Sequence, residues 1–130
     1  MGVSHLTVAY WCVIVAAGLP YAAAWIAKAG AFGTRDNLQP REWAGRQSGW
    51  RARANAAQAN SFEGLPLFIG AVIVAHQMGA AQARIDALAL AYVLLRVAYI
   101  ALYVRNKGLA RSAVWTLAFT ANMALFFVSK

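Results

Sequence analysis

Cysteine and histidine, the side chains that most often form disulfides or hold metal ions, are scarce in this sequence of 130 residues. Its single cysteine, Cys12, lies in an apolar stretch, so an intrachain disulfide is impossible and the thiol is expected to pack in the core. His5 and His76 are far apart, and no His-x-x-x-His or Cys-x-x-Cys spacing occurs. The sequence therefore predicts no metal site.

Acidic residues are also scarce, with 4 Asp and Glu against 12 Lys and Arg, and the formal net charge is +8. In a soluble protein this balance would suggest a nucleic-acid partner. Hydrophobic residues make up 62% of the chain, however, whereas apolar residues are about half of a typical soluble domain. We therefore predict an integral membrane protein whose partners are lipids and lipophilic molecules, and no nucleic acid.

Four apolar stretches with short polar connections are long enough to cross a bilayer, since a transmembrane helix takes roughly 20 residues. This pattern predicts an all-α fold, a multi-pass four-helix bundle in which residues 1–130 form a single domain. The second helix is expected to begin before it reaches the lipid, because arginines precede its apolar part. The four helices are predicted over about residues 5–29, 43–78, 83–106 and 109–129.

The positive charges are gathered in two segments of the chain. Six of the twelve Lys and Arg residues follow the first apolar stretch, and three follow the third. In a chain with four spans these segments face the same side, which the positive-inside rule makes cytoplasmic. The basic loops, about residues 29–46 and 105–111, are therefore expected in the cytoplasm and both termini outside. The nine residues are Lys28, Arg35, Arg41, Arg46, Arg51, Arg53, Arg105, Lys107 and Arg111.

Two ionisable residues, Glu63 and Arg96, lie inside the second and third predicted spans. An ionised group in hydrocarbon costs at least about 2.5 kcal/mol, so both side chains are expected to face the interior of the bundle. The simplest interpretation is a buried ion pair that fixes the register of the two helices, with tyrosines packed alongside.

Further polar residues share these two helices with Glu63 and Arg96 at helical spacing, which favours a binding site over a lone ion pair. On the third helix, Tyr99 and Tyr103 share one stripe with Arg96. On the second, residues spaced by seven share another stripe, with Glu63 nearby. Because positive charge and hydrogen-bond donors are in surplus, the pattern suits a ligand that carries carboxylates. The second stripe contains Arg46, Arg53 and Asn60.

The segment 51–68, RARANAAQANSFEGLPLF, places an arginine and an alanine ahead of Asn-x-x-Glu, Pro and Phe. The segment 96–112, RVAYIALYVRNKGLARS, places two tyrosines and further arginines after an arginine. Together they resemble the MAPEG family, the membrane-associated proteins in eicosanoid and glutathione metabolism, and within it the microsomal glutathione transferases of bacterial type. In the first segment the matching residues are Arg53, Ala54, Asn60, Glu63, Pro66 and Phe68.

The resemblance implies a homotrimer of four-helix subunits with glutathione, as co-substrate, bound between neighbouring subunits near the cytoplasmic face. It also implies that an arginine near the start of the fourth helix stabilises the thiolate, for which Arg111 and Arg105 are rival candidates. The residues implied to hold the tripeptide are Arg53, Gln58, Asn60, Glu63, Arg96, Tyr99 and Tyr103.

The implied activity is detoxification, by conjugation of glutathione to lipophilic electrophiles, by reduction of lipid hydroperoxides, or by both. A free thiol has a pKa of about 8.5. A guanidinium beside it lowers that pKa, so that the nucleophilic thiolate forms at neutral pH. Two positions depart from the leukotriene-conjugating members, which have an arginine at Ala56 and an aromatic residue at Gly64. These departures leave open a non-catalytic, lipid- or fatty-acid-binding protein of the same fold. A small multidrug exporter is disfavoured, because the first span lacks a carboxylate.

Overall fold

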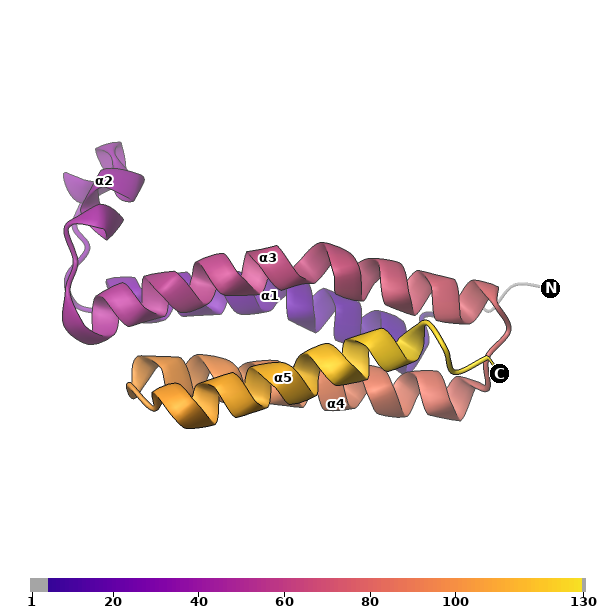
Figure 1. Ribbon diagram of the computed structural model, residues 1–130. Coiled ribbons are helices and arrows are strands. Elements are labelled where there is room, and N and C mark those ends of the chain that lie inside the picture. Colours follow the sequence, from indigo (N-terminus) through magenta and orange to yellow (C-terminus); the bar gives the residue numbers. More distant parts are fainter. Residues whose placement is uncertain (1–4, 130) are drawn as a thin grey trace.

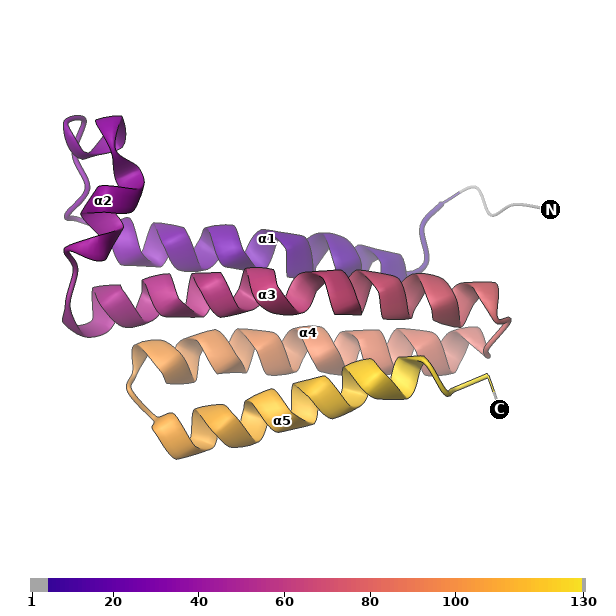
Figure 2. The same ribbon diagram turned by 45° about the horizontal axis from the view of Figure 1, so that its top comes forward.

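The computed structural model, which describes residues 5–129, is helical and has no strand in that range, so the all-α prediction is confirmed. Four long helices lie side by side along one another (Figures 1 and 2). Helix α3 packs most extensively on α1, helix α5 packs most extensively on α4, and α4 also contacts α1 and α3. The four helices are α1 (Val8–Lys28), α3 (Gly49–Gln77), α4 (Gln82–Val104) and α5 (Gly108–Leu125).

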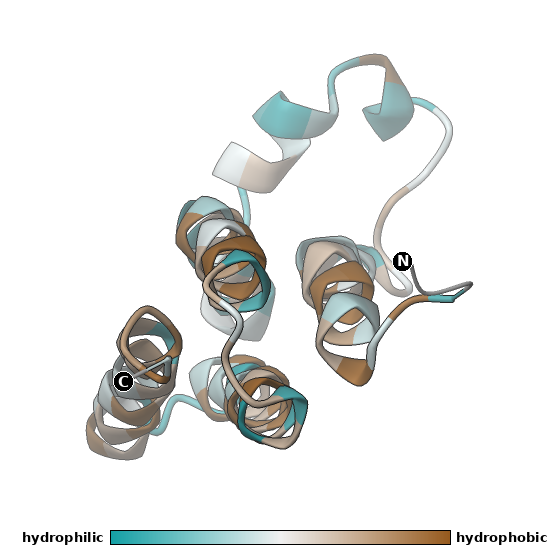
Figure 3. Cartoon of the chain, turned by 90° about the vertical axis from the view of Figure 1, so that its right-hand side faces the viewer, coloured by the Kyte–Doolittle hydropathy of each residue, from teal (hydrophilic) through white to brown (hydrophobic). Residues whose placement is uncertain are grey.

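Three of these helices, α1, α3 and α4, are long and apolar enough to cross a membrane. Helix α5 does not reach the same hydropathy, because Arg111 and Asn122 interrupt its apolar residues. Large apolar side chains such as Trp25, Leu94 and Leu117 are exposed on the outer faces of the long helices. The view along the bundle shows hydrophobic residues on outward as well as inward sides (Figure 3). An exposed apolar surface of this extent is typical of contact with lipid.

Small side chains allow the helices to approach one another closely. The main buried cluster is rich in alanine, as is typical of helix contacts in membranes, where packing has to replace the hydrophobic effect. Between α3 and α4 the rings of Phe68 and Tyr92 stack with their centroids 4.1 Å apart. These contacts hold the polar stripes of α3 and α4 against each other. The buried alanines of this cluster are Ala9, Ala16, Ala71, Ala75, Ala89 and Ala118.

Helix α3 begins at Gly49, later than the start near residue 43 that the sequence predicts. A 3-10 turn, η1 (Asp36–Leu38), and a short helix, α2 (Pro40–Gly45), precede it. Trp43 is buried in α2, where its indole N–H donates to the Ala31 carbonyl at 3.3 Å. The chain then turns through Gly49, whose φ of 61° lies in the left-handed region that suits glycine. These tertiary contacts override the helical pattern of the sequence.

Helices α1 and α5 are shorter than the sequence predicts, α1 mainly at its start and α5 mainly at its end. Helix α1 begins at Val8 because the Thr7 hydroxyl accepts a hydrogen bond from the Tyr10 amide at 3.2 Å and caps the helix. Helix α5 ends at Leu125, four residues before the predicted end at 129, where the chain passes into turns.

Arginines from α3 close one end of the bundle. The Nη1 atom of Arg51 donates to the carbonyls of Ala27 at 2.8 Å and Ala29 at 2.7 Å, at the end of α1. The Nε atom of Arg53 donates to the Val104 carbonyl at 3.1 Å, at the end of α4. The last carbonyls of a helix lack partners within it, so these cationic donors stabilise both helix ends. The segment that carries α2 and the α4–α5 turn lie at this same end (Figure 1).

At the opposite end, the Asp86 carboxylate ties the start of α1 to α4. Its Oδ1 atom accepts from the Ala9 amide at 3.0 Å and from Gln82 Nε2 at 2.8 Å. His76, at the end of α3, contacts the Thr7 hydroxyl at 3.0 Å through Nε2. The register of α1, α3 and α4 is therefore held by polar contacts at both ends.

Replacing Arg51 by alanine is expected to lower the free energy of unfolding by about 1–2 kcal/mol, because two charge-assisted hydrogen bonds to the end of α1 are lost. Thermal unfolding of the detergent-solubilised protein measures this change. The matched control is Arg35→Ala, at an exposed arginine in the connection between α1 and α3. Equal midpoints for the two variants would contradict the structural role of Arg51.

Candidate functional site

A buried guanidinium occupies the middle of α4. Arg96 is only 4% exposed, and its Nη2 atom donates to Asn60 Oδ1 at 2.7 Å and to Ser61 Oγ at 3.4 Å. Its guanidinium carbon lies 4.2 Å from the centre of the Tyr99 ring. All of these partners are neutral. Among residues 5–129 the ion pairs join Arg46 to Asp36 and Glu42, so the charge of Arg96 has no carboxylate to balance it.

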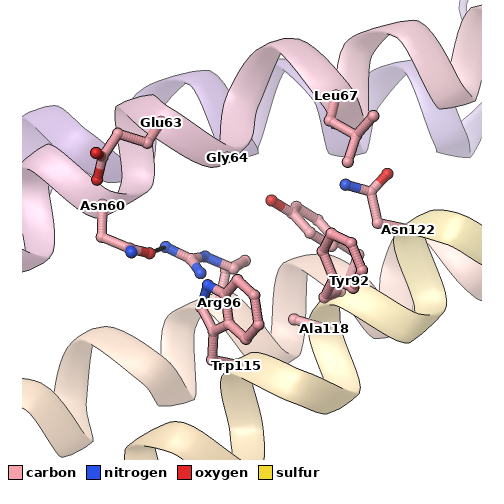
Figure 4. A pocket seen from close by; sticks show the side chains of 10 residues that line it. Asn60, Glu63, Gly64, Leu67, Tyr92, Arg96, Trp115, Ala118 and Asn122 are labelled. Atoms are coloured by element: carbon pink, nitrogen blue, oxygen red, sulfur yellow. Dashed lines mark hydrogen bonds between the residues drawn. The ribbon is translucent and has the colours of Figure 1, made fainter.

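The predicted ion pair between Glu63 and Arg96 is not formed. Glu63 is exposed at the outer side of α3, and its carboxylate points away from the guanidinium (Figure 4). Asn60, one helical turn earlier, takes the position next to Arg96 instead. The helical spacing places both residues near the same stripe, but the neutral amide lies closer to α4. Glu63 remains at the rim of the site.

A first pocket, of about 290 Å³, lies beside Arg96 between α3, α4 and α5. Figure 4 shows its two halves. Near Arg96 it is polar, because Asn60 and Glu63 contribute there. Away from Arg96 it is mostly apolar and aromatic. That half is lined by Gly64, Leu67, Tyr92, Ala118, Phe119 and Asn122, and Trp115 lies beside Arg96.

A second pocket, of about 280 Å³, adjoins the first on the side of the α4–α5 turn and shares Asn60 and Trp115 with it. Its charged residue is Arg111, whose guanidinium carbon lies 4.4 Å from the centre of the Tyr103 ring. The ring of Tyr99 meets that of Tyr103 edge to face, with the centroids 5.7 Å apart. The two pockets thus adjoin each other, and each has one arginine in its wall.

Six of the predicted site residues meet around these two pockets, and three do not line them. Arg53 donates to the Val104 carbonyl, and Gln58 lines neither pocket. Arg105 is exposed and lines a separate apolar groove between α1 and α4. Of the two candidates for the thiolate, the structure therefore brings only Arg111 to the cluster. The six residues are Asn60, Glu63, Arg96, Tyr99, Tyr103 and Arg111.

Sequence reasoning did not identify two residues of the first pocket, Tyr92 and Asn122. Tyr92 lies one helical turn before Arg96, so the stripe of α4 could have been extended to it. Asn122 is 2% exposed, and its Oδ1 atom has no hydrogen-bond partner. An amide within the mostly apolar second half of α5 was the signal, since a buried polar group costs free energy.

The structure offers no metal centre within residues 5–129, where no group of three or more His, Cys, Asp and Glu side chains could hold an ion. The sequence model of the MAPEG family matches residues 8–129, nearly the whole chain. No curated protein and no solved structure matches the chain.

Proposed function

Because the chain belongs to the MAPEG family, a membrane family of eicosanoid and glutathione metabolism, we propose that it is a glutathione-dependent enzyme. It conjugates glutathione to lipophilic electrophiles or uses it to reduce lipid hydroperoxides. The observation that carries this proposal is the Arg96 guanidinium, which is buried among neutral partners. A buried charge is costly unless an opposite charge accompanies it. An anionic ligand supplies that charge.

The chemistry of glutathione complements the two pockets. The tripeptide carries two carboxylates and one ammonium group, and guanidinium groups bind carboxylates with paired hydrogen bonds. Arg96 binds a carboxylate in the first pocket, where Asn60 already fixes the orientation of its guanidinium. Glu63, exposed at the rim, accepts the ammonium group. This division of charges favours a peptide over a simple inorganic anion.

Arg111 acts on the thiol. Its stacking on the Tyr103 ring holds the guanidinium over the second pocket, where Tyr99 and Ser112 also line the wall. A guanidinium at hydrogen-bond distance lowers the pKa of the glutathione thiol and favours the thiolate.

The sulfur attacks an electrophilic carbon and an S–C bond forms. In a substitution the leaving group departs with the electron pair of its bond, and in the addition to a 2-alkenal the electron pair of the C=C bond forms an enolate that takes a proton. In the peroxidase reaction the sulfur attacks the terminal oxygen of the hydroperoxide, an S–O bond forms, the O–O bond breaks, and the alkoxide leaves and takes a proton. The resulting sulfenic acid condenses with a second glutathione to give glutathione disulfide and water.

The chain crosses the membrane four times in this proposal, with α5 as the fourth span. Helix α5 runs along α4 (Figure 2). Leu117 and Phe119 are exposed on it. The basic α2 segment and the α4–α5 turn share one end of the bundle, which supports a cytoplasmic location for both and external termini. In this proposal three copies assemble, as the resemblance to the family implies. The exposure of Glu63 and Trp115 beside the pockets supports a neighbouring subunit that covers them.

A second candidate function is a lipid- or fatty-acid-binding protein without catalysis. The observation in its favour is the groove of about 280 Å³ between α1 and α4, which is almost entirely apolar and ends at Arg105. A fatty acid would place its chain along Leu19, Ile26 and Val97 and its carboxylate at Arg105. This function would not use the charge of Arg96.

Titration calorimetry of the detergent-purified protein with glutathione tests the proposal directly. We expect saturable binding, and loss of that binding for the diester of glutathione, in which both carboxylates are neutral. Turnover is then measured with a panel of lipophilic electrophiles and lipid hydroperoxides. Binding of a fatty acid without binding of glutathione would favour the second candidate. Absence of glutathione binding together with absence of turnover would overturn the proposed function.

A further inference from the structure

We propose that the apolar half of the first pocket receives the lipophilic co-substrate, and that Asn122 recognises an uncharged oxygen, of a hydroxyl or carbonyl group, on that molecule. The inference rests on the proposed function and specifies the substrate class of the same site. The recognised oxygen lies remote from the reacting atom. Asn122 is thereby a specificity-determining residue and takes no part in the chemistry.

The first observation is an unsatisfied amide inside the bundle. Asn122 is 2% exposed, its Oδ1 atom is buried without a hydrogen-bond partner, and the residue lines the pocket. Figure 4 shows the Nδ2 atom of its side chain directed at the space between Leu67 and Tyr92, with Oδ1 on the other side of the amide. A buried polar group that has no hydrogen-bond partner lowers the stability of the protein. This loss is larger than the net stabilisation that a typical hydrogen bond provides. A ligand oxygen in that space accepts a hydrogen bond from Nδ2, and a half-turn of the amide presents Oδ1 to a ligand hydroxyl, which removes that cost.

The second observation is a hydroxyl group on the opposite wall. The Tyr92 ring is fixed by stacking on Phe68 at 4.1 Å, and its hydroxyl points toward Gly64 (Figure 4). A Cβ atom at Gly64 would lie 3.2 Å from that oxygen, so the glycine gives the hydroxyl its space. Tyr92 and Asn122 thus present two neutral polar groups to one pocket. Neither carries a charge, so this end of the pocket suits an uncharged group better than a buried ion.

The remaining walls determine what else the molecule contains. Leu67, Trp115 and Phe119 surround the space with apolar surface, which suits a hydrocarbon chain or ring. Arg111 and Asn122 are eleven positions apart on α5, a separation of about 16 Å along the helix axis. A molecule that reacts with the thiolate at Arg111 and reaches Asn122 is therefore elongated. Its second oxygen group lies toward the far end of the chain.

Paired substrates test the inference. We compare kcat/KM for 2-alkenals with kcat/KM for ω-hydroxy-2-alkenals of the same chain length, over a series of lengths. The wild-type protein is expected to prefer the hydroxylated member by about tenfold at the best length. In Asn122→Leu, which has similar size and no amide, the ratio is expected to fall to about one. Thr120→Val, on an exposed position of the same helix, is the matched control and keeps the wild-type ratio.

Photolabelling supplies a readout that needs no turnover. A long-chain primary alcohol and an alkane of equal length, each with a diazirine group, are irradiated with the full-length protein in lipid nanodiscs, and labelled peptides are identified by mass spectrometry. We expect the alcohol, and not the alkane, to label the part of α5 between Trp115 and Asn122. Asn122→Leu is expected to lose the difference between the probes.

The outcomes separate this inference from the proposed function. If glutathione does not bind but the alcohol labels the pocket selectively, the proposed function fails and the recognition of an uncharged oxygen at Asn122 stands. If glutathione binds and alkenals are conjugated, but wild-type protein shows no preference for the hydroxylated substrate at any length and no selective labelling, the inference is overturned. The substrate preference and the selective labelling are both measured on the wild-type chain, so a folding defect in a variant cannot affect them.

Discussion

Replacing Arg96 by leucine is expected to weaken glutathione binding at least about 30-fold without lowering the thermal unfolding midpoint of the protein in the absence of glutathione. The loss follows because a carboxylate bound to a buried guanidinium contributes about 2 kcal/mol or more. The midpoint is maintained because the substitution removes a buried charge whose partners, Asn60 and Ser61, are both neutral. Titration calorimetry measures the affinity, and thermal unfolding measures the stability.

The stabilisation of the folded protein by bound glutathione is a second measurement of the same loss of affinity. Glutathione at about 100 times its dissociation constant would stabilise wild-type protein by about 2.7 kcal/mol, because it binds only the folded state. In Arg96→Leu that stabilisation is expected to fall to about 0.9 kcal/mol or less at the same concentration, because the dissociation constant is at least about 30 times higher. The control is Arg84→Leu, which removes an exposed arginine near the other end of α4 and keeps the glutathione effect. An Arg96→Leu protein that binds glutathione normally would contradict the role assigned to this residue.

The helices could be predicted from the sequence because long apolar stretches have few alternatives in a chain of this composition. The start of α3 could not be predicted from the sequence. It depends on the contact of Trp43 with the Ala31 carbonyl and on the left-handed backbone of Gly49, and neither follows from hydrophobic periodicity. Local helical propensity favoured a longer helix, and a tertiary contact overrode it.

The stripes of α3 and α4 predicted which residues face each other but not which of them make contact. Helical spacing brings Asn60 and Glu63 to neighbouring positions, and the choice between them depends on where the guanidinium of Arg96 reaches. Charge alone favoured Glu63. The structure favours Asn60, which leaves the guanidinium with a neutral partner and turns an expected ion pair into a candidate anion site.

The separation of Arg105 from Arg111 also required the structure. The chain turns between them at Asn106, whose φ is 61°, a conformation that asparagine tolerates better than most residues. Arg105 stays at the end of α4 beside α1, whereas Arg111 lies on α5 and faces Tyr103. Spacing along the sequence carries no information about this change of direction. The two arginines, which are equivalent candidates for the thiolate partner in the sequence, therefore lie on different sides of α4.

Replacing Arg111 by alanine is expected to lower kcat by about 10²- to 10³-fold, the loss typical of removing one group that stabilises a reacting anion. The dissociation constant of glutathione is expected to change little, because Arg96 and Asn60 still hold the carboxylate. Turnover of the variant should rise as the pH approaches about 8.5, where the thiol ionises unaided. The wild-type rate should depend less on pH in that range, since Arg111 already favours the thiolate at neutral pH.

Arg105→Ala is the matched control for this substitution, because it removes the same charge and a side chain of the same size six positions earlier. Arg105 lines the groove between α1 and α4 and none of the wall around Tyr103, so its loss is expected to leave kcat and its pH dependence unchanged. The reverse pattern, with turnover lost in Arg105→Ala and kept in Arg111→Ala, would mean that the thiolate lies beside α1. The stacking of Arg111 on Tyr103 argues against that arrangement, since it already holds a guanidinium at the wall of the pocket that adjoins Arg96.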